Sequence, residues 1–308
     1  MIKTDAVLGV FFALFAAIGF SAKAILIKLA YLDHVDAITL LALRMAFSVP
    51  FFIIAAIWVN RRDAEPLNKK DWLVVLVLGL LGYYLSSFLD FLGLLYITAG
   101  LERLILFLYP TLTVILTAII YKRPIGHRVM SAMALSYVGI VLVFFHDIGL
   151  SEGNAAISRA DVILGSILIF CSALSYSSYL VGAGHSIARI GATRFTAYAS
   201  IVASFASILQ FLLTHPLSAL NVTMKAYQLS IAMAIFSTVL PVFLLSYAIH
   251  HIGPSRSSLI GSVGPVATIA LAYFFLGEAV SLLQISGTIL VLAGVVTISL
   301  SAKKSSNN

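Results

Sequence analysis

The sequence predicts an all-α integral membrane protein with ten transmembrane helices in two inverted five-helix repeats. Of its 308 residues, 61% are hydrophobic and 10% are charged, whereas a soluble domain carries about 25% charged residues. The apolar residues fall into ten runs of about 20 residues, which is the length that crosses the hydrocarbon core of a bilayer. The second half of the chain also repeats features of the first half.

The ten apolar runs are separated by short polar connections, which leave no stretch for a soluble domain. The longest connections, 147–160 and 215–226, contain Asp, Glu, Asn, Pro and Gly. We therefore expect a first repeat at residues 1–150 and a second at 155–302. The expected helices are 6–30, 37–59, 72–96, 100–121, 126–146, 161–183, 192–214, 227–250, 255–277 and 280–300.

Positive charges are distributed unevenly among the connections. With a cytoplasmic N-terminus, thirteen Lys and Arg residues lie in inner segments and three in outer ones. Cytoplasmic loops carry such an excess, so we expect both termini in the cytoplasm and a multi-pass protein of the cell inner membrane. The net charge of +7 then comes from these cytoplasmic connections and does not indicate binding to nucleic acid. The expected partners are the lipid bilayer and a small-molecule substrate, not nucleic acid, and a homodimer is left open.

Internal similarity emerges when the chain is shifted by 155 or 156 residues. Five spans per repeat, an odd number, place the second repeat upside down in the membrane. Inverted repeats are typical of secondary transporters, whose substrate sites lie near the midplane between the halves. The matching pairs include Leu104 with Leu259, Pro110 with Pro265, Thr113 with Thr268, Gly139 with Gly294 and, at a shift of 156, Ser21 with Ser177.

Two prolines, Pro110 and Pro265, fall inside the fourth and ninth expected helices. Proline in a helix removes a hydrogen bond and kinks the rod. Such breaks are tolerated where protein or a water-filled cavity satisfies the freed carbonyls. Either proline alone is equally consistent with a simple kink in a packed helix. Two prolines at equivalent positions favour hinges beside a cavity.

Five charged residues lie within, or at the outer start of, the first four expected helices: Lys23, Arg44, Asp90, Glu102 and Arg103. Charges inside a membrane are costly and are functional candidates by default. We expect a cluster on the outer side of the cavity, for which three interpretations stay open. It could be a structural network of Arg44–Asp90 and Lys23–Glu102 pairs. It could be a substrate site in which Lys23 or Arg44 holds a carboxylate. It could also be a proton relay through Asp90 or Glu102.

Hydroxyl and aromatic side chains recur in three expected helices. The candidates for the cavity lining are Tyr83 and Ser87 in the third helix, Ser175 and Tyr179 in the sixth, and Ser258 in the ninth. Such a lining would suit a small zwitterion or an amphipathic metabolite. The alternative is that small polar residues serve helix–helix packing.

Enzymatic motifs are lacking in the sequence. It contains no His-Glu-x-x-His, no Gly-x-Ser-x-Gly and no phosphate-binding loop, which are signatures of metal-dependent, nucleophilic and phosphoryl-transfer chemistry. We therefore expect no enzyme, no catalytic residue, no metal and no cofactor. A channel would show a pore-lining repeat or a ring of charge. The alternative that stays open is a non-transporting membrane sensor or scaffold.

Two stretches carry a family resemblance. Residues 247–295 contain an Ile-Gly-x-Ser-Arg-x-Ser segment, a mid-helix proline, Gly-Glu and a glycine-containing last helix; residues 96–112 read YITAGLERLILFLYPTL. These stretches resemble EamA-type transporters of the drug/metabolite transporter superfamily. The resemblance implies an inner-membrane carrier that exports a small metabolite, such as an amino acid or related amphipathic compound. One departure is Arg123, at the repeat-one position that corresponds to Glu278, so a paired role for Glu278 is not expected.

Overall fold

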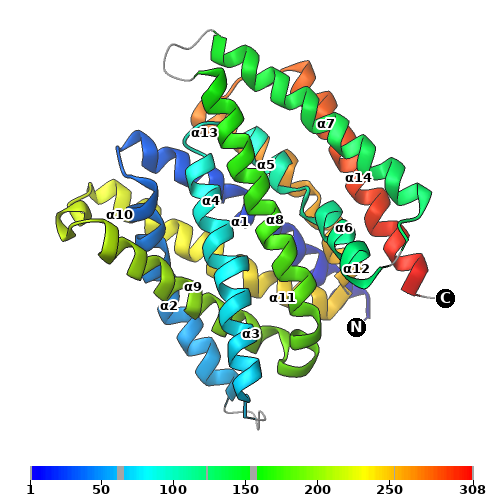
Figure 1. Ribbon diagram of the computed structural model, residues 1–308, viewed down its shortest axis with the longest axis horizontal. Helices are drawn as coiled ribbons and strands as arrows, with labels where there is room; N and C mark the ends of the chain where they lie inside the picture. Colours follow the sequence, from blue (N-terminus) through cyan, green and yellow to red (C-terminus); the bar gives the residue numbers. More distant parts are fainter. Residues whose placement is uncertain (1, 61–65, 123, 153–157, 253, 307–308) are drawn as a thin grey trace.

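The computed structural model describes residues 2–60, 66–122, 124–152, 158–252 and 254–306, and the regular elements in these ranges are all helical (Figure 1). Both chain ends lie on the same side of the bundle (Figure 1). The first half contains α1 (Ile2–Leu32), α2 (Ala37–Asn60), α3 (Lys69–Gly79), η1 (Leu80–Leu85), α4 (Ser86–Gly93), α5 (Ala99–Leu106), α6 (Tyr109–Tyr121) and α7 (His127–Glu152). The second half contains α8 (Arg159–Ile190), α9 (Ala192–Thr214), η2 (Leu217–Leu220), α10 (Met224–Ala234), η3 (Ile235–Val239), α11 (Leu240–Ile252), α12 (Pro254–Gly261), α13 (Val263–Leu276) and α14 (Leu282–Ser306).

Eight helical stretches of the described chain are long and apolar enough to cross a membrane: Val7–Leu32, Ala37–Asn60, Lys69–Gly93, Ala99–Tyr121, His127–Gly149, Arg159–Gly184, Ala192–Thr214 and Met224–Ile252. They coincide with the first eight runs expected from the sequence. The last two expected runs correspond to shorter apolar helices, Val263–Leu276 and Leu282–Thr297. The ninth run is shorter because a break separates α12 from α13.

Two helices are interrupted at equivalent positions. The break between α5 and α6 falls at Phe107 and Leu108, and the break between α12 and α13 falls at Ser262, 155 residues after Phe107. Pro110 and Pro265 lie in the first turn of the segment that follows each break. An N–H in a first turn has no intrahelical partner, so proline is tolerated there. The prolines thus start new segments and do not merely kink continuous helices.

A second pair of irregularities has the same spacing. The π-helical turn η1 begins at Leu80 and the π-helical turn η3 begins at Ile235, again 155 residues apart. A π-turn inserts one extra residue into an α-helix and is often found at functional sites. These turns could not be predicted from the sequence, because their residues have no distinctive pattern.

The helices α7 and α14 run side by side on one flank of the bundle (Figure 1). Glycines set their close approach, because a Cβ atom on Gly139 would lie 2.5 Å from the carbonyl oxygen of Gly287. A Cβ atom on Gly294 would likewise meet the carbonyl oxygen of Ala132. Gly139 and Gly294 are equivalent in the two halves, as are Ala132 and Gly287. Small residues allow such backbone contact between spanning helices.

The two broken helices each pack against the first helix of the opposite half. Helix α1 lies against α11 and α13, and α8 lies against α4 and α6. The buried side chains Ile27 and Ala30 of α1 belong to one core cluster, and Ile169 of α8 belongs to another. This arrangement brings α1 to one break and α8 to the other.

Candidate functional site

Three charged side chains meet between α1, α4 and α5. The ammonium nitrogen of Lys23 lies 2.5 Å from Oδ2 of Asp90 and 3.6 Å from Oε1 of Glu102. Asp90 is 2% exposed and Glu102 is completely buried. Lys23 therefore contacts two carboxyl groups from two helices, and the expected Lys23–Glu102 pair is part of a three-residue cluster.

Arg44 takes a different partner from the one expected. Its Nε donates a hydrogen bond to Oγ1 of Thr238 at 3.0 Å, and its guanidinium lies over the ring of Phe91, 5.3 Å from the centroid. The Thr238 hydroxyl donates to the Met233 carbonyl, which leaves its oxygen lone pairs free to accept from Arg44. The expected Arg44–Asp90 pair is therefore not formed, and Asp90 is paired with Lys23 instead.

Arg103 reaches from α5 to the start of α13. A Cβ atom on Gly264 would lie 2.6 Å from Nη2 of Arg103. The guanidinium therefore occupies the space that a side chain at position 264 would need. Gly264 directly precedes Pro265, so the Gly-Pro pair makes room for a charge beside the break.

At each break, the carbonyl group that precedes the proline accepts a hydrogen bond from a serine of a neighbouring helix. The hydroxyl of Ser21 on α1 lies 2.9 Å from the carbonyl oxygen of Gly264, and the hydroxyl of Ser177 on α8 lies 3.0 Å from that of Tyr109. Each hydroxyl also contacts the carbonyl four residues earlier in its own helix. Tyr109 and Gly264 are 155 residues apart and each precedes a proline. The serine pair found by the sequence shift thus has the same structural role in both halves.

Aromatic rings surround the break that follows α5. The hydroxyls of Tyr83 and Tyr179 lie 3.2 Å apart, with ring centroids 5.1 Å apart. Tyr176 lies between Tyr179 and Tyr109, at centroid distances of 5.6 Å and 5.4 Å. Phe195 stacks on Tyr179 at 6.1 Å. Tyr109 and Phe195 were not predicted as site residues, although the position of Tyr109 directly before Pro110 was a usable signal.

The predicted serines differ in their surroundings. Ser175 donates a hydrogen bond to the carbonyl oxygen of Leu81 at 2.8 Å, within the π-turn η1, so it ties α8 to the third span. Ser87 is half-buried on α4, three residues before Asp90. Ser258 belongs to α12, but its side chain lies outside the described part of the structure. Ser175 therefore has the packing role that the sequence left open.

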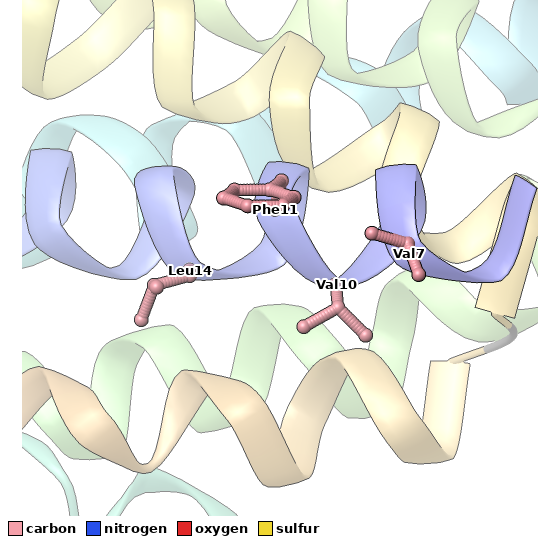
Figure 2. A pocket seen from close by; sticks show the side chains of 4 residues that line it. All are labelled: Val7, Val10, Phe11 and Leu14. Carbon is pink, nitrogen blue, oxygen red and sulfur yellow. The ribbon is translucent and has the colours of Figure 1, made fainter. Parts of the chain in front are cut away.

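A wide apolar pocket of about 360 Å³ lies beside the start of α1 (Figure 2). Its lining residues are Val7, Val10, Phe11 and Leu14. They offer no polar group that could orient a metabolite, and three of them are exposed on the surface of the bundle. We interpret this pocket as part of the lipid-facing surface, separate from the charged cluster and the tyrosines.

A helical bundle with long apolar spans and charged side chains buried between them is a multi-pass membrane protein. Two segments, residues 7–145 and 163–300, match the EamA-like transporter family. The chain belongs to this family and is a membrane transporter.

Several relatives of the chain carry transporter names. The uncharacterized transporter YcbK of Bacillus subtilis is 31% identical over 92% of this chain and 90% of its own length. The uncharacterized inner membrane transporter YicL of Salmonella typhimurium is 24% identical over 77% of this chain and 76% of its own. A crystal structure that is 18% identical in sequence has a TM-score of 0.64 and covers 96% of this chain and 98% of its own. That last likeness concerns the fold alone.

Proposed function

We propose that the protein is a secondary transporter that exports a small amphipathic metabolite, such as an amino acid or related compound, by alternating access. The observation that carries this proposal is the pair of equivalent breaks, each held by an equivalent serine. Duplicated breaks in spanning helices mark the substrate region in many transporters built from repeats. The apolar helices α13 and α14 then complete the ninth and tenth spans of two inverted five-helix repeats.

The proposed orientation rests on the distribution of positive charge. The excess of Lys and Arg residues in the segments on the side of the chain ends favours a cytoplasmic location for both termini. The loops that hold Asp33 and Glu278 then face the outside. The name of YicL supports placing this protein in the inner membrane as well.

The amphipathic nature of the substrate is inferred from the difference between the two breaks. Tyr109 at the first break contributes a ring that packs on Tyr176. Its counterpart Gly264 contributes no side chain, and the guanidinium of Arg103 fills the space. One break is therefore lined by aromatic rings and the other by charge. A compound with an apolar body and a charged head would match both linings.

A transport experiment tests this proposal. Proteoliposomes would be loaded with a mixed pool of amino acids and related metabolites, and efflux would be followed by mass spectrometry. We expect selective efflux that Lys23→Ala and Asp90→Asn abolish, and that the loop variant Lys225→Ala leaves in place. Selective efflux unchanged by the first two variants would assign the cluster to helix packing. An absence of efflux from folded protein would favour a membrane sensor or scaffold.

A further inference from the structure

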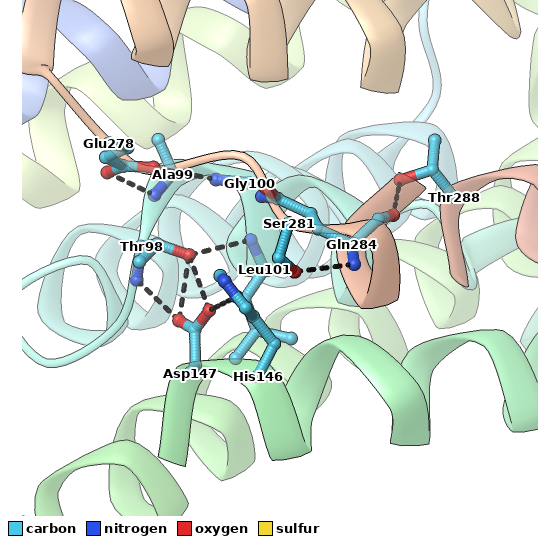
Figure 3. A network of polar contacts seen from close by, with 10 residues as sticks. All are labelled: Thr98, Ala99, Gly100, Leu101, His146, Asp147, Glu278, Ser281, Gln284 and Thr288. Atoms are coloured by element: carbon cyan, nitrogen blue, oxygen red, sulfur yellow. Dashed lines mark hydrogen bonds and ion pairs between the residues drawn. The ribbon is translucent and has the colours of Figure 1, made fainter. Parts of the chain in front are cut away.

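The carboxylate of Glu278 lies at the start of α5 (Figure 3). It accepts a hydrogen bond from the backbone N–H of Ala99 at 2.9 Å and from that of Gly100 at 3.4 Å. The first N–H groups of a helix have no partner within the helix, and the helix dipole favours a negative charge at this position. Glu278 therefore caps a helix that lies far from it in the sequence.

The next contacts hold the same helix start within the first half. Asp147 on α7 accepts from the N–H of Thr98 at 3.1 Å and from its hydroxyl at 2.8 Å. The Thr98 hydroxyl oxygen in turn accepts from the N–H of Leu101 at 3.1 Å. Asp147 and Thr98 thus fix α5 to its own repeat, whereas Glu278 fixes it to the other repeat.

The position of α5 matters because the helix carries two of the buried charges. Glu102 and Arg103 follow the N–H groups held by Glu278 by only two to four residues. Arg103 also reaches Gly264 at the second break. A movement of the α13–α14 loop away from α5 would therefore change the surroundings of the charged cluster.

The residue at the equivalent position of the first repeat cannot make the same contact. The residue 155 positions before Glu278 is Arg123, which lies outside the described residues. A guanidinium carries only hydrogen-bond donors. It cannot accept from the N–H groups at the start of a helix, as the carboxylate of Glu278 does. The duplication therefore kept the helix breaks on both sides but kept this carboxylate on one side alone.

We propose that Glu278 is a one-sided latch that holds the outer side of the transporter closed by binding the start of α5. This inference rests on the proposed alternating-access function. Opening the outer side separates the α13–α14 loop from α5 and breaks both hydrogen bonds to Glu278. Water then solvates the carboxylate and the two N–H groups. Because the guanidinium at position 123 cannot accept a hydrogen bond, the latch biases the carrier toward its outward-closed state.

Spin labels on either side of the latch can measure this bias directly. Leu95 and Val280 are exposed residues that flank the contact on the two repeats. Replacing both with cysteine in a Cys171→Ala background leaves no other thiol, since Cys171 is the only native cysteine. Distances between the labels in proteoliposomes would report the outward-closed and outward-open populations. The measurement requires no knowledge of the substrate.

The latch predicts the outcome for three variants. Glu278→Gln keeps the size of the side chain but offers only one accepting oxygen, so we expect the ratio of open to closed populations to rise roughly tenfold. Glu278→Ala should raise it at least as much. Ser281→Ala is the matched control in the same loop, because its hydroxyl accepts from Gln284 and not from α5. It should leave the populations unchanged.

The results also separate the latch from the proposed function. Two populations in the parent protein with no shift in Glu278→Gln would overturn the latch and leave alternating access standing. A lower melting temperature of Glu278→Gln with unchanged populations would show a structural helix cap only. A single unchanging distance in every variant, together with no transport, would overturn both.

Discussion

Ser21 and Ser177 are separated by 156 residues and make the same hydrogen bond, each to the carbonyl that directly precedes a proline at a helix break. The side chains beside the two bonds differ. Gly264 faces the guanidinium of Arg103, whereas Tyr109 faces Tyr176. The shared bond indicates that both halves need a broken helix at this position. The side chains that surround the break differ between the halves.

Loss of this hydroxyl should affect transport more than folding. We expect Ser177→Ala to lower the free energy of unfolding by about 1 kcal/mol, because the net contribution of a hydrogen bond is modest, and to slow efflux severalfold. The matched control is Ser178→Ala, since the exposed Ser178 hydroxyl bonds only to Leu174 of its own helix. Thermal unfolding in detergent and proteoliposome efflux would measure both effects. Equal efflux in the two variants would contradict a functional role for the break.

The sequence predicted the helical class and the first eight spans, because long apolar runs identify spanning helices. Lys23, Asp90 and Glu102 were three of the five residues proposed for a charged cluster, because charges inside a membrane are rare and costly, and the structure brings these three together. The sequence could not predict that Lys23 lies near both carboxyl groups while Arg44 forms a hydrogen bond with Thr238, because the choice of partner depends on how each helix is rotated about its axis. Glu278 was also missed. Its partners are backbone N–H groups 178 and 179 residues away, and no side-chain pattern encodes such a contact.

Removing the ammonium of Lys23 should destabilise the protein strongly. Lys23→Ala leaves Asp90 and the completely buried Glu102 without their shared cation, and breaking a buried ion pair costs about 3–5 kcal/mol. Adding Asp90→Asn removes a carboxylate that has lost its cation and should restore part of that loss. Urea or thermal unfolding of the single and double variants gives the coupling energy. Additive losses would show that the two side chains act independently.

Filling the space at Gly264 should displace Arg103 without unfolding the protein. The new methyl group of Gly264→Ala would meet the flexible end of Arg103, which can move away. Alanine also favours a helix over glycine by up to about 1 kcal/mol, so stability should change little while efflux falls. Gly261→Ala is the matched control, because nothing lies within 4 Å of its added Cβ atom. Similar efflux from both variants would mean that the position of Arg103 is not important.

The two prolines at the breaks should matter more than a proline within an intact helix. Pro110→Ala and Pro265→Ala supply an N–H where each second segment begins, which permits a continuous helix and should slow the exchange between open and closed states. Pro50 lies inside α2, which continues through it, so Pro50→Ala is the comparison. Efflux rates and label distances would be measured for all three. Normal insertion and unaltered efflux in Pro265→Ala would contradict the hinge.

The loop between α1 and α2 predicts a dependence of stability on pH. The carboxylate of Asp33 accepts hydrogen bonds from Lys225 at 3.0 Å and from Thr223 at 2.8 Å. These bonds lower the pKa of Asp33 below its ordinary value of 3.8, and the bond from Lys225 has the larger effect. A carboxyl group whose pKa is lower in the folded protein stabilises the fold above the ordinary pKa, and this contribution is lost as the pH falls through the folded value.

Comparison with Asp33→Asn isolates this contribution from that of other carboxylates. The melting temperature of the parent protein in detergent should exceed that of the variant by a constant amount at pH values well above 3.8. The difference should shrink as the pH falls below 3.8, because protonated Asp33 no longer attracts Lys225 as an ion. A difference that stays the same down to the lowest pH at which the protein is folded would mean that the hydrogen bond from Thr223, and not the charge, ties the loop to α10.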